Sequence, residues 1–65
     1  MEAFGKLIEI KEQSVVIEEV GIGQAEILFA KDSPPELIPA VGAEVSLSVR
    51  MAGTGTRFGT DIRED

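Results

Sequence analysis

The sequence predicts a small all-β protein whose strands close into a barrel. Stretches with a β-type pattern alternate with turn residues at intervals of about ten residues, a spacing typical of small sandwiches and barrels. The apolar residues occur in short alternating runs, as half-buried strands require. No long segment repeats its apolar residues with the period of about 3.6 residues that an amphipathic helix would show.

The first two strands are predicted over residues 4–11 and 14–20. In the first, Ile8 and Ile10 share one face and Glu9 lies between them, so this face is expected to point into the core. The second is rich in β-branched residues, which favour extended backbone. A short polar joint separates the two runs, which is typical of neighbouring antiparallel strands.

The third strand is predicted over residues 24–30. It follows a turn at Gly21 and Gly23, whose lack of a Cβ atom allows positive φ. Residues 31–39 contain all three prolines and cannot continue a β-ladder, because proline has no N–H donor. We therefore expect a long connection there, with one helical turn that Ser33 caps.

The fourth strand, Glu44–Met51, has the clearest pattern, since three apolar residues alternate strictly with polar ones. Residues 52–56 combine two glycines with small polar residues and are expected to form a flexible hairpin loop. A shorter final strand is predicted over residues 57–62. The domain is therefore expected to span residues 1–62, with residues 63–65 as a frayed tail.

Five strands with a long connection between the third and the fourth are typical of an OB-like Greek-key barrel. An SH3-like barrel is the alternative, because strand number and loop lengths are similar in the two architectures. In either barrel, the alternating apolar positions of four strands point inward. The predicted core consists of Ile8, Ile10, Val15, Ile17, Ala25, Ile27, Phe29, Val45, Leu47 and Val49.

The composition predicts a protein that is not an enzyme. The chain has no cysteine, histidine, tyrosine, tryptophan or asparagine, so the usual nucleophile–base pairs and metal-binding sets are missing. Glu18 and Glu19 are adjacent, but neighbours on a strand point to opposite faces and cannot share a proton or a metal ion. No cofactor, metal or small-molecule substrate is therefore expected.

Charge and cysteine content predict the cellular location of the protein and its behaviour toward nucleic acid. The lack of cysteine and of a signal-peptide pattern favours a cytoplasmic protein, and the apolar stretches are too short to span a membrane. Twelve acidic residues against six basic ones give a formal net charge of −6. A negative protein repels phosphate backbones at long range, so nonspecific nucleic-acid binding is disfavoured.

The candidate binding residues are cations in the predicted strands, one phenylalanine and the glycine-rich loop. In an OB-type site, cations contact phosphates and aromatic rings stack on bases. The loop lacks the Lys-Ser/Thr pair of a phosphate-binding loop, so its predicted role is that of a mobile contact loop. The full candidate set is Lys6, Arg50, Gly53, Thr54, Gly55, Arg57 and Phe58.

Four runs carry a resemblance to a known family. They are Gly5-Lys6-Leu7-Ile8, Val15-Val16-Ile17-Glu18, Val20-Gly21-Ile22-Gly23 and Glu36-Leu37-Ile38-Pro39-Ala40-Val41-Gly42-Ala43-Glu44-Val45. Over residues 4–49 the chain resembles the amino-terminal OB domain of the RuvA branch-migration family. The resemblance implies an OB fold and a tendency to self-associate. That family carries an acidic pin after the fourth strand and helix-hairpin-helix domains on junction DNA, whereas residues 52–56 contain no acid, so junction processing is not implied.

The sequence leaves two functions open. The first is a non-catalytic protein-interaction or assembly module, with self-association as one form of it. The second is a nucleic-acid-binding OB module. Weak binding is predicted in the second case, because Lys6, Arg50 and Arg57 would neutralise at most about three phosphates, whereas tight duplex binders neutralise about six to ten.

Overall fold

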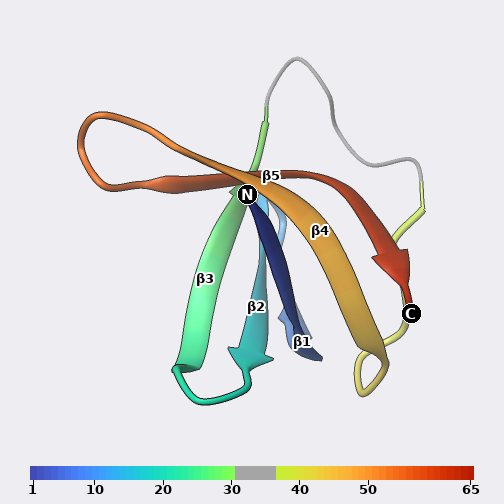
Figure 1. Ribbon diagram of the computed structural model, residues 1–65. Coiled ribbons are helices and arrows are strands. Elements are labelled where there is room, and N and C mark those ends of the chain that lie inside the picture. The colour runs from blue at the N-terminus through green and yellow to red at the C-terminus, as the bar shows by residue number, and fades with distance from the viewer. Residues whose placement is uncertain (31–36) are drawn as a thin grey trace.

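A computed structural model describes residues 1–30 and 37–65 of the chain. The described residues form a closed barrel of five strands and contain no helix (Figure 1). The prediction of an all-β, five-stranded barrel is confirmed. The strands are β1 (Glu2–Ile10), β2 (Ser14–Glu19), β3 (Gly23–Phe29), β4 (Glu44–Met51) and β5 (Arg57–Glu64).

The order of the strands around the barrel is β1-β2-β3-β5-β4, and β4 pairs with β1 to close it. The pair of β3 and β5 is parallel, and the other four pairs are antiparallel. Because β5 lies between β3 and β4 in this order, the chain passes from β3 to β4 by a crossover and not by a hairpin. This crossover is the Greek-key feature that an OB-like barrel requires, and a simple meander would have paired β4 with β3.

The core confirms most of the predicted inward positions on β2, β3 and β4. Val15, Ile17, Ile27, Val45 and Leu47 are fully buried. These positions alternate along their strands as the pleat requires. The remaining buried apolar residues are Ala3, Leu7, Ala30 and Val49, and partly buried neighbours that pack on the core are Phe29, Ile38, Ala43 and Ile62.

The predicted inward face of β1 is wrong as far as Ile8, and Ile10 is not part of the core. Leu7 is buried, whereas Ile8 is half-buried and Ile10 is 40% exposed. A register shift between Leu7 and Glu9 shows that the strand is irregular at Ile8. The inward face also holds Gly5, where a Cβ atom would collide with the backbone carbonyl of β2. After this irregularity the inward parity changes, since Ile10 pairs with the buried Val15 but lies at the strand end, and the sequence does not show where such a change occurs.

Two further core assignments are weaker than predicted. Ala25 and Phe29 are half-buried, because β3 is covered by β5 over a short length. Leu28 pairs with Phe58, and Phe29 pairs with Gly59, at the end of β3. The first half of β3 has β2 as its strand neighbour and is left more exposed on the other side.

The predicted frayed tail is also wrong, because β5 continues to Glu64. Arg63 pairs with Ser46 and Glu64 pairs with Val45. A bulge precedes this pairing, and in it Asp61 adopts a positive φ of 56°. Positive φ is uncommon outside glycine, although aspartate tolerates it better than most residues. Nothing in the sequence distinguishes such a bulge from the end of a strand.

The connection between β3 and β4 includes residues 31–36, so the predicted turn capped by Ser33 lies outside the described residues. The connection rejoins the barrel beside β1. The N–H of Gly42 donates to the carbonyl oxygen of Leu7 at 2.8 Å, and the N–H of Leu7 donates to that of Ala43 at 2.9 Å. In residues 1–30 and 37–65, no helix has the length and apolar character needed to cross a membrane.

We predict that Leu47→Ala lowers the free energy of unfolding by about 2–4 kcal/mol, because it leaves a cavity among fully buried side chains. Ile10→Ala removes a similar side chain from a position that is 40% exposed, so its expected cost is below about 1 kcal/mol. Chemical denaturation of both variants measures the difference. A larger loss for Ile10→Ala than for Leu47→Ala would contradict the register of β1.

We predict that Gly59→Ala destabilises the barrel by about 1–3 kcal/mol through overpacking. An added Cβ atom would lie 2.7 Å from both Ile27 Cγ2 and Leu47 Cδ1 in the core. Gly53→Ala is the matched control, since its Cβ would meet nothing within 4 Å. Thermal unfolding of the two variants should separate them clearly, and equal melting temperatures would disprove the close contact of β5 with the core.

Candidate functional site

The structure places most of the predicted binding residues on the β4–β5 hairpin and leaves Lys6 apart from them. Lys6 lies on β1, the glycine-rich loop joins β4 to β5, and Arg57 lies at the start of β5. The exposed Lys6 is the register partner of Glu18 on β2 and of Glu44 on β4. A glutamate therefore flanks it on either side, which opposes its predicted role as a phosphate contact.

Arg57 is held within the protein. Its Nη1 donates to Oε1 of Glu19 at 2.6 Å, and the two side chains are 26% and 10% exposed. Glu19 follows the inward parity of β2, opposite in direction to the exposed Glu18. The ion pair joins the end of β2 to the start of β5, across the part of β3 that β5 does not cover. Because these residues are far apart in the sequence, no local pattern predicts their contact.

Arg50 and Phe58 do lie together, as cross-strand partners on β4 and β5. Arg50 is exposed and Phe58 is half-buried, with Leu28 of β3 as its other partner. The exposed aromatic ring is Phe4, which is 57% exposed on β1. The described surface thus offers one cation beside one partly covered ring, which is a small basis for stacking and phosphate contact.

The loop at residues 52–56 is a compact turn that extends away from the barrel (Figure 1). The N–H of Ala52 donates to the carbonyl oxygen of Thr56 at 2.8 Å, and that of Gly55 donates to Ala52 at 2.9 Å. Gly55 has a φ of 87°, and the hydroxyls of Thr54 and Thr56 are 3.1 Å apart. These donors are used within the turn, so they are not directed at a ligand.

The outer face of β2 and β3, which binds ligands in OB-type barrels, is acidic. Glu18 and Glu26 are exposed on it. Glu26 accepts hydrogen bonds from Ser14 Oγ at 2.7 Å and from Lys11 Nζ at 3.4 Å. The bond from Ser14, with a further contribution from Lys11, lowers the pKa of Glu26 from its ordinary value of 4.5 and keeps it ionised. Lys11 is therefore bonded to Glu26 of the same face and adds no free positive charge to it.

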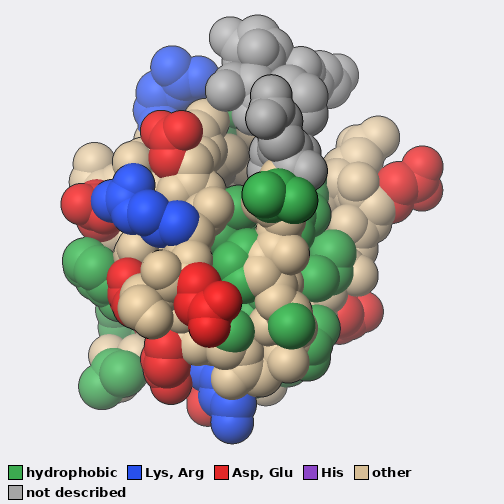
Figure 2. All heavy atoms as spheres, turned by 90° about the vertical axis from the view of Figure 1, so that its right-hand side faces the viewer, with side chains coloured by type: hydrophobic (Ala, Val, Ile, Leu, Met, Phe, Trp, Pro, Cys, Tyr) green, Lys and Arg blue, Asp and Glu red, His purple; other side chains and the backbone are tan. Residues whose placement is uncertain are grey.

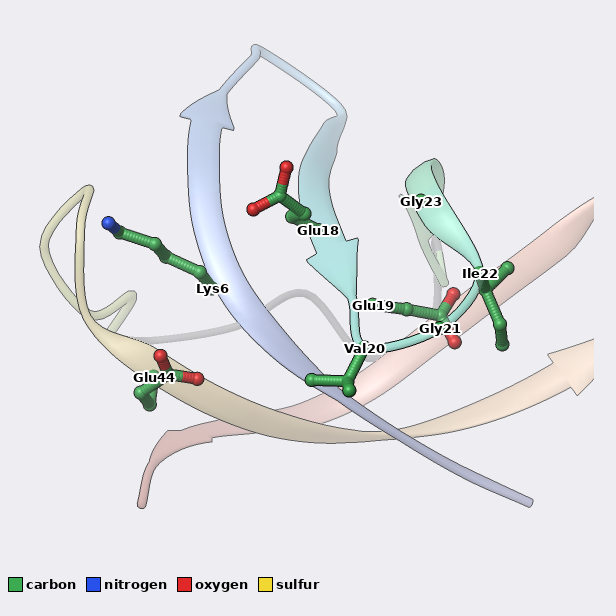
Figure 3. Close-up of a pocket in the computed structure, with 8 residues that line it drawn as sticks. All are labelled: Lys6, Glu18, Glu19, Val20, Gly21, Ile22, Gly23 and Glu44. Carbon is green, nitrogen blue, oxygen red and sulfur yellow. The ribbon is translucent and has the colours of Figure 1, made fainter.

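A shallow hollow surrounds the turn between β2 and β3 (Figure 3). Its volume is about 540 Å³. Val20 and Ile22 are 90% and 70% exposed at this turn. Gly21 and Gly23 have φ values of 79° and 109°, a backbone that favours glycine. The lining residues are Lys6, Glu18, Glu19, Val20, Gly21, Ile22, Gly23 and Glu44.

The hollow has apolar side chains at the tip of the β2–β3 turn and charged side chains around its edge. Figure 3 shows Glu18 and Glu44 on either side of β1, with Lys6 between them and Val20 near the same strand, whereas Ile22 points the other way. Among the described residues, no group of three or more acids has the geometry to hold a metal ion. This surface is not predicted from the sequence, because the second strand is predicted to include Val20, whereas β2 ends at Glu19. The sequence feature that could have indicated this exposed surface is the alternation of Val20 and Ile22 with Gly21 and Gly23.

We predict a coupling free energy above about 1 kcal/mol for the Arg57–Glu19 pair in a double-mutant cycle of Arg57→Met and Glu19→Gln. Either single change should destabilise the protein by about 1–3 kcal/mol, because it leaves a mostly buried polar group without its partner. The pair of Arg63 and Glu2 is the control, at 3.4 Å with side chains 61% and 45% exposed. Its expected coupling is about 0–0.5 kcal/mol. Equal couplings in denaturant unfolding would contradict the structural role of Arg57.

Comparison with protein-family models, with curated proteins and with solved structures finds no match to this chain, so the resemblance to the RuvA barrel stays a prediction and the geometry of the hollow carries the argument about function.

Proposed function

We propose that this barrel is a non-catalytic module that binds another protein through the surface around the β2–β3 turn. This hairpin surface consists of Lys6, Glu18, Val20, Ile22 and Glu44. The observation that carries the proposal is the exposure of Val20 and Ile22, at 90% and 70%, beside a hollow with charged residues at its rim. Exposed apolar side chains with charged neighbours are a usual feature of protein interfaces.

Burial of these two side chains supplies a driving force for association. Removing a Val or Ile side chain from water is worth about 1.5–3 kcal/mol, so burial of both would contribute substantially to binding. The anchors stand on a turn whose ends are fixed by the β2–β3 ladder, where Glu19 pairs with Gly23. A turn held in this way loses little conformational freedom when a partner binds.

A catalytic role has little support in the described residues. The buried titratable side chain among them is Glu19, and it is paired with Arg57 at 2.6 Å. A general acid or base needs a proton affinity tuned near neutral pH and access to a substrate. A carboxylate that is bonded to a guanidinium and mostly covered lacks this access to a substrate.

Nucleic-acid binding is the second candidate, and the pairing of Arg50 with Phe58 is the observation in its favour. Against it, Arg57 is engaged by Glu19, and Lys6 is flanked by two glutamates. Figure 2 shows acidic and basic side chains interspersed on one face, with no continuous basic area there. The electrostatic term that dominates nucleic-acid affinity is therefore weak among the described residues.

We predict that a protein partner from the source cells binds the wild type at least about 10-fold more tightly than the double variant Val20→Ser with Ile22→Ser. The reason is the loss of both apolar anchors. The measurement is affinity capture, followed by titration of the purified partner. Met51→Ser is the matched control, because Met51 is 54% exposed but lies at the end of β4, away from the turn. Unchanged thermal unfolding of both variants shows that the barrel is intact.

Oligonucleotide binding by the wild type and its variants decides between protein binding and nucleic-acid binding. Single-stranded and duplex oligonucleotides at about 150 mM salt should bind more weakly than about 10 μM. Submicromolar binding that Arg50→Glu abolishes would favour the nucleic-acid module. A partner that binds the double variant as tightly as the wild type would contradict the hairpin surface as the binding site.

A further inference from the structure

We infer that the segment which docks on the hairpin surface is a basic one, with two cations about 10 Å apart on either side of an apolar residue. This inference rests on the proposed function, because it names the chemistry of the partner at the same surface. It is carried by the arrangement of three charges on three neighbouring strands, next to exposed Val20.

The three charges are Lys6 on β1 and its register partners, Glu18 on β2 and Glu44 on β4. All three residues are exposed. The ion pairs within 4 Å among the described residues join Lys11 to Glu26, Arg57 to Glu19 and Arg63 to Glu2, so this triplet is outside them. Two carboxylates and one ammonium group are thus open to a partner, and the acids are in excess.

The register sets the distance between the two acids. Neighbouring strands lie about 4.8 Å apart, so the backbones of β2 and β4, on either side of β1, are separated by about 10 Å. Figure 3 shows the side chains of Glu18 and Glu44 on opposite sides of β1. A partner with cations at this separation reaches both carboxylates at once.

Lys6 restricts the partner further. Its backbone lies between Glu18 and Glu44 in the register, and Figure 3 shows its ammonium group at the edge of the surface, on the side away from Val20. A third cation on that side of the partner would face this ammonium group, and like charges brought together are unfavourable. An uncharged apolar residue between the two cations avoids this repulsion and lies beside Val20, which is 90% exposed.

The charge of the whole protein favours the same partner. A formal net charge of −6 attracts a basic segment at long range and raises its association rate. A second copy of the chain is disfavoured, because a two-fold contact at this surface would bring the acid-rich surfaces of two negative proteins together. A phosphate-bearing ligand would find Lys6 alone, between two carboxylates.

The test uses four blocked peptides and amide chemical shifts of the whole chain. The probe Lys-Leu-Val-Lys has its cations three residues apart, which places them on the same side of a polyproline II chain, about 9 Å apart. The peptide Lys-Lys-Leu-Val has the same composition with adjacent cations. Lys-Ser-Ser-Lys lacks the apolar residues, and Glu-Leu-Val-Glu reverses the charge. We expect the first peptide to bind at least about 5-fold more tightly than each of the others, a difference of about 1 kcal/mol.

The expected shifts lie at Lys6, at residues 18–23 and at Glu44. The double variant Glu18→Gln with Glu44→Gln should weaken binding of the first peptide by about 10-fold. The control Glu9→Gln with Glu12→Gln makes the same change of charge at two exposed residues elsewhere, and it should leave the affinity unchanged. Equal losses in the two variants, shifts spread over other acids, or equal binding of Lys-Leu-Val-Lys and Lys-Lys-Leu-Val would each overturn the inference.

Binding of the captured partner to the two double variants distinguishes failure of this inference from failure of the proposed function. If the partner's binding needs Val20 and Ile22 but survives Glu18→Gln with Glu44→Gln, the protein-interaction function stands and the basic segment is wrong. If its binding depends on neither pair of residues, the proposed function fails as well.

Discussion

The barrel depends on the close approach of β5 to β3 and β4 at Gly59. This glycine is buried, and the space of its missing side chain is filled by Ile27 and Leu47, two fully buried residues. At this point β5 pairs with β3 on one side and with β4 on the other. Without such an approach, β3 and β4 would have free edges, and an open sheet of this size would bury a smaller core.

The parallel contact of β3 with β5 is short, and it leaves a part of β3 that Arg57 spans through its ion pair with Glu19. It extends over Leu28 and Phe29, so the remainder of β3 does not pair with β5. Arg57 bridges this part of the barrel to Glu19 at the end of β2. A residue that would otherwise add positive charge to the surface therefore stabilises the fold. The exposed surface near the β2–β3 turn keeps its acids, which supports the basic partner that we propose over a phosphate backbone.

The bulge at Asp61 connects the far end of β5 to the same surface. After the bulge, β5 regains its register with β4, and the N–H of Asp65 donates to the carbonyl oxygen of Glu44 at 3.0 Å. Glu44 begins β4 and borders the hollow. The strained backbone of one residue, with a φ of 56°, thus helps to hold one acid of the hairpin surface opposite Lys6.

Strand patterns and turn residues were enough to predict the five strands, the turn at Gly21 and Gly23 and the inward face of β4, because alternation and turn residues act over a few positions. The folded barrel was needed to show that Leu7 rather than Ile10 enters the core and that Glu19 meets Arg57. It was also needed to show that Lys6 lies apart from Arg50 and Arg57, beside acids from two other strands. These features depend on strand register and barrel closure, which pair residues that are distant along the chain, and no local pattern carries that information.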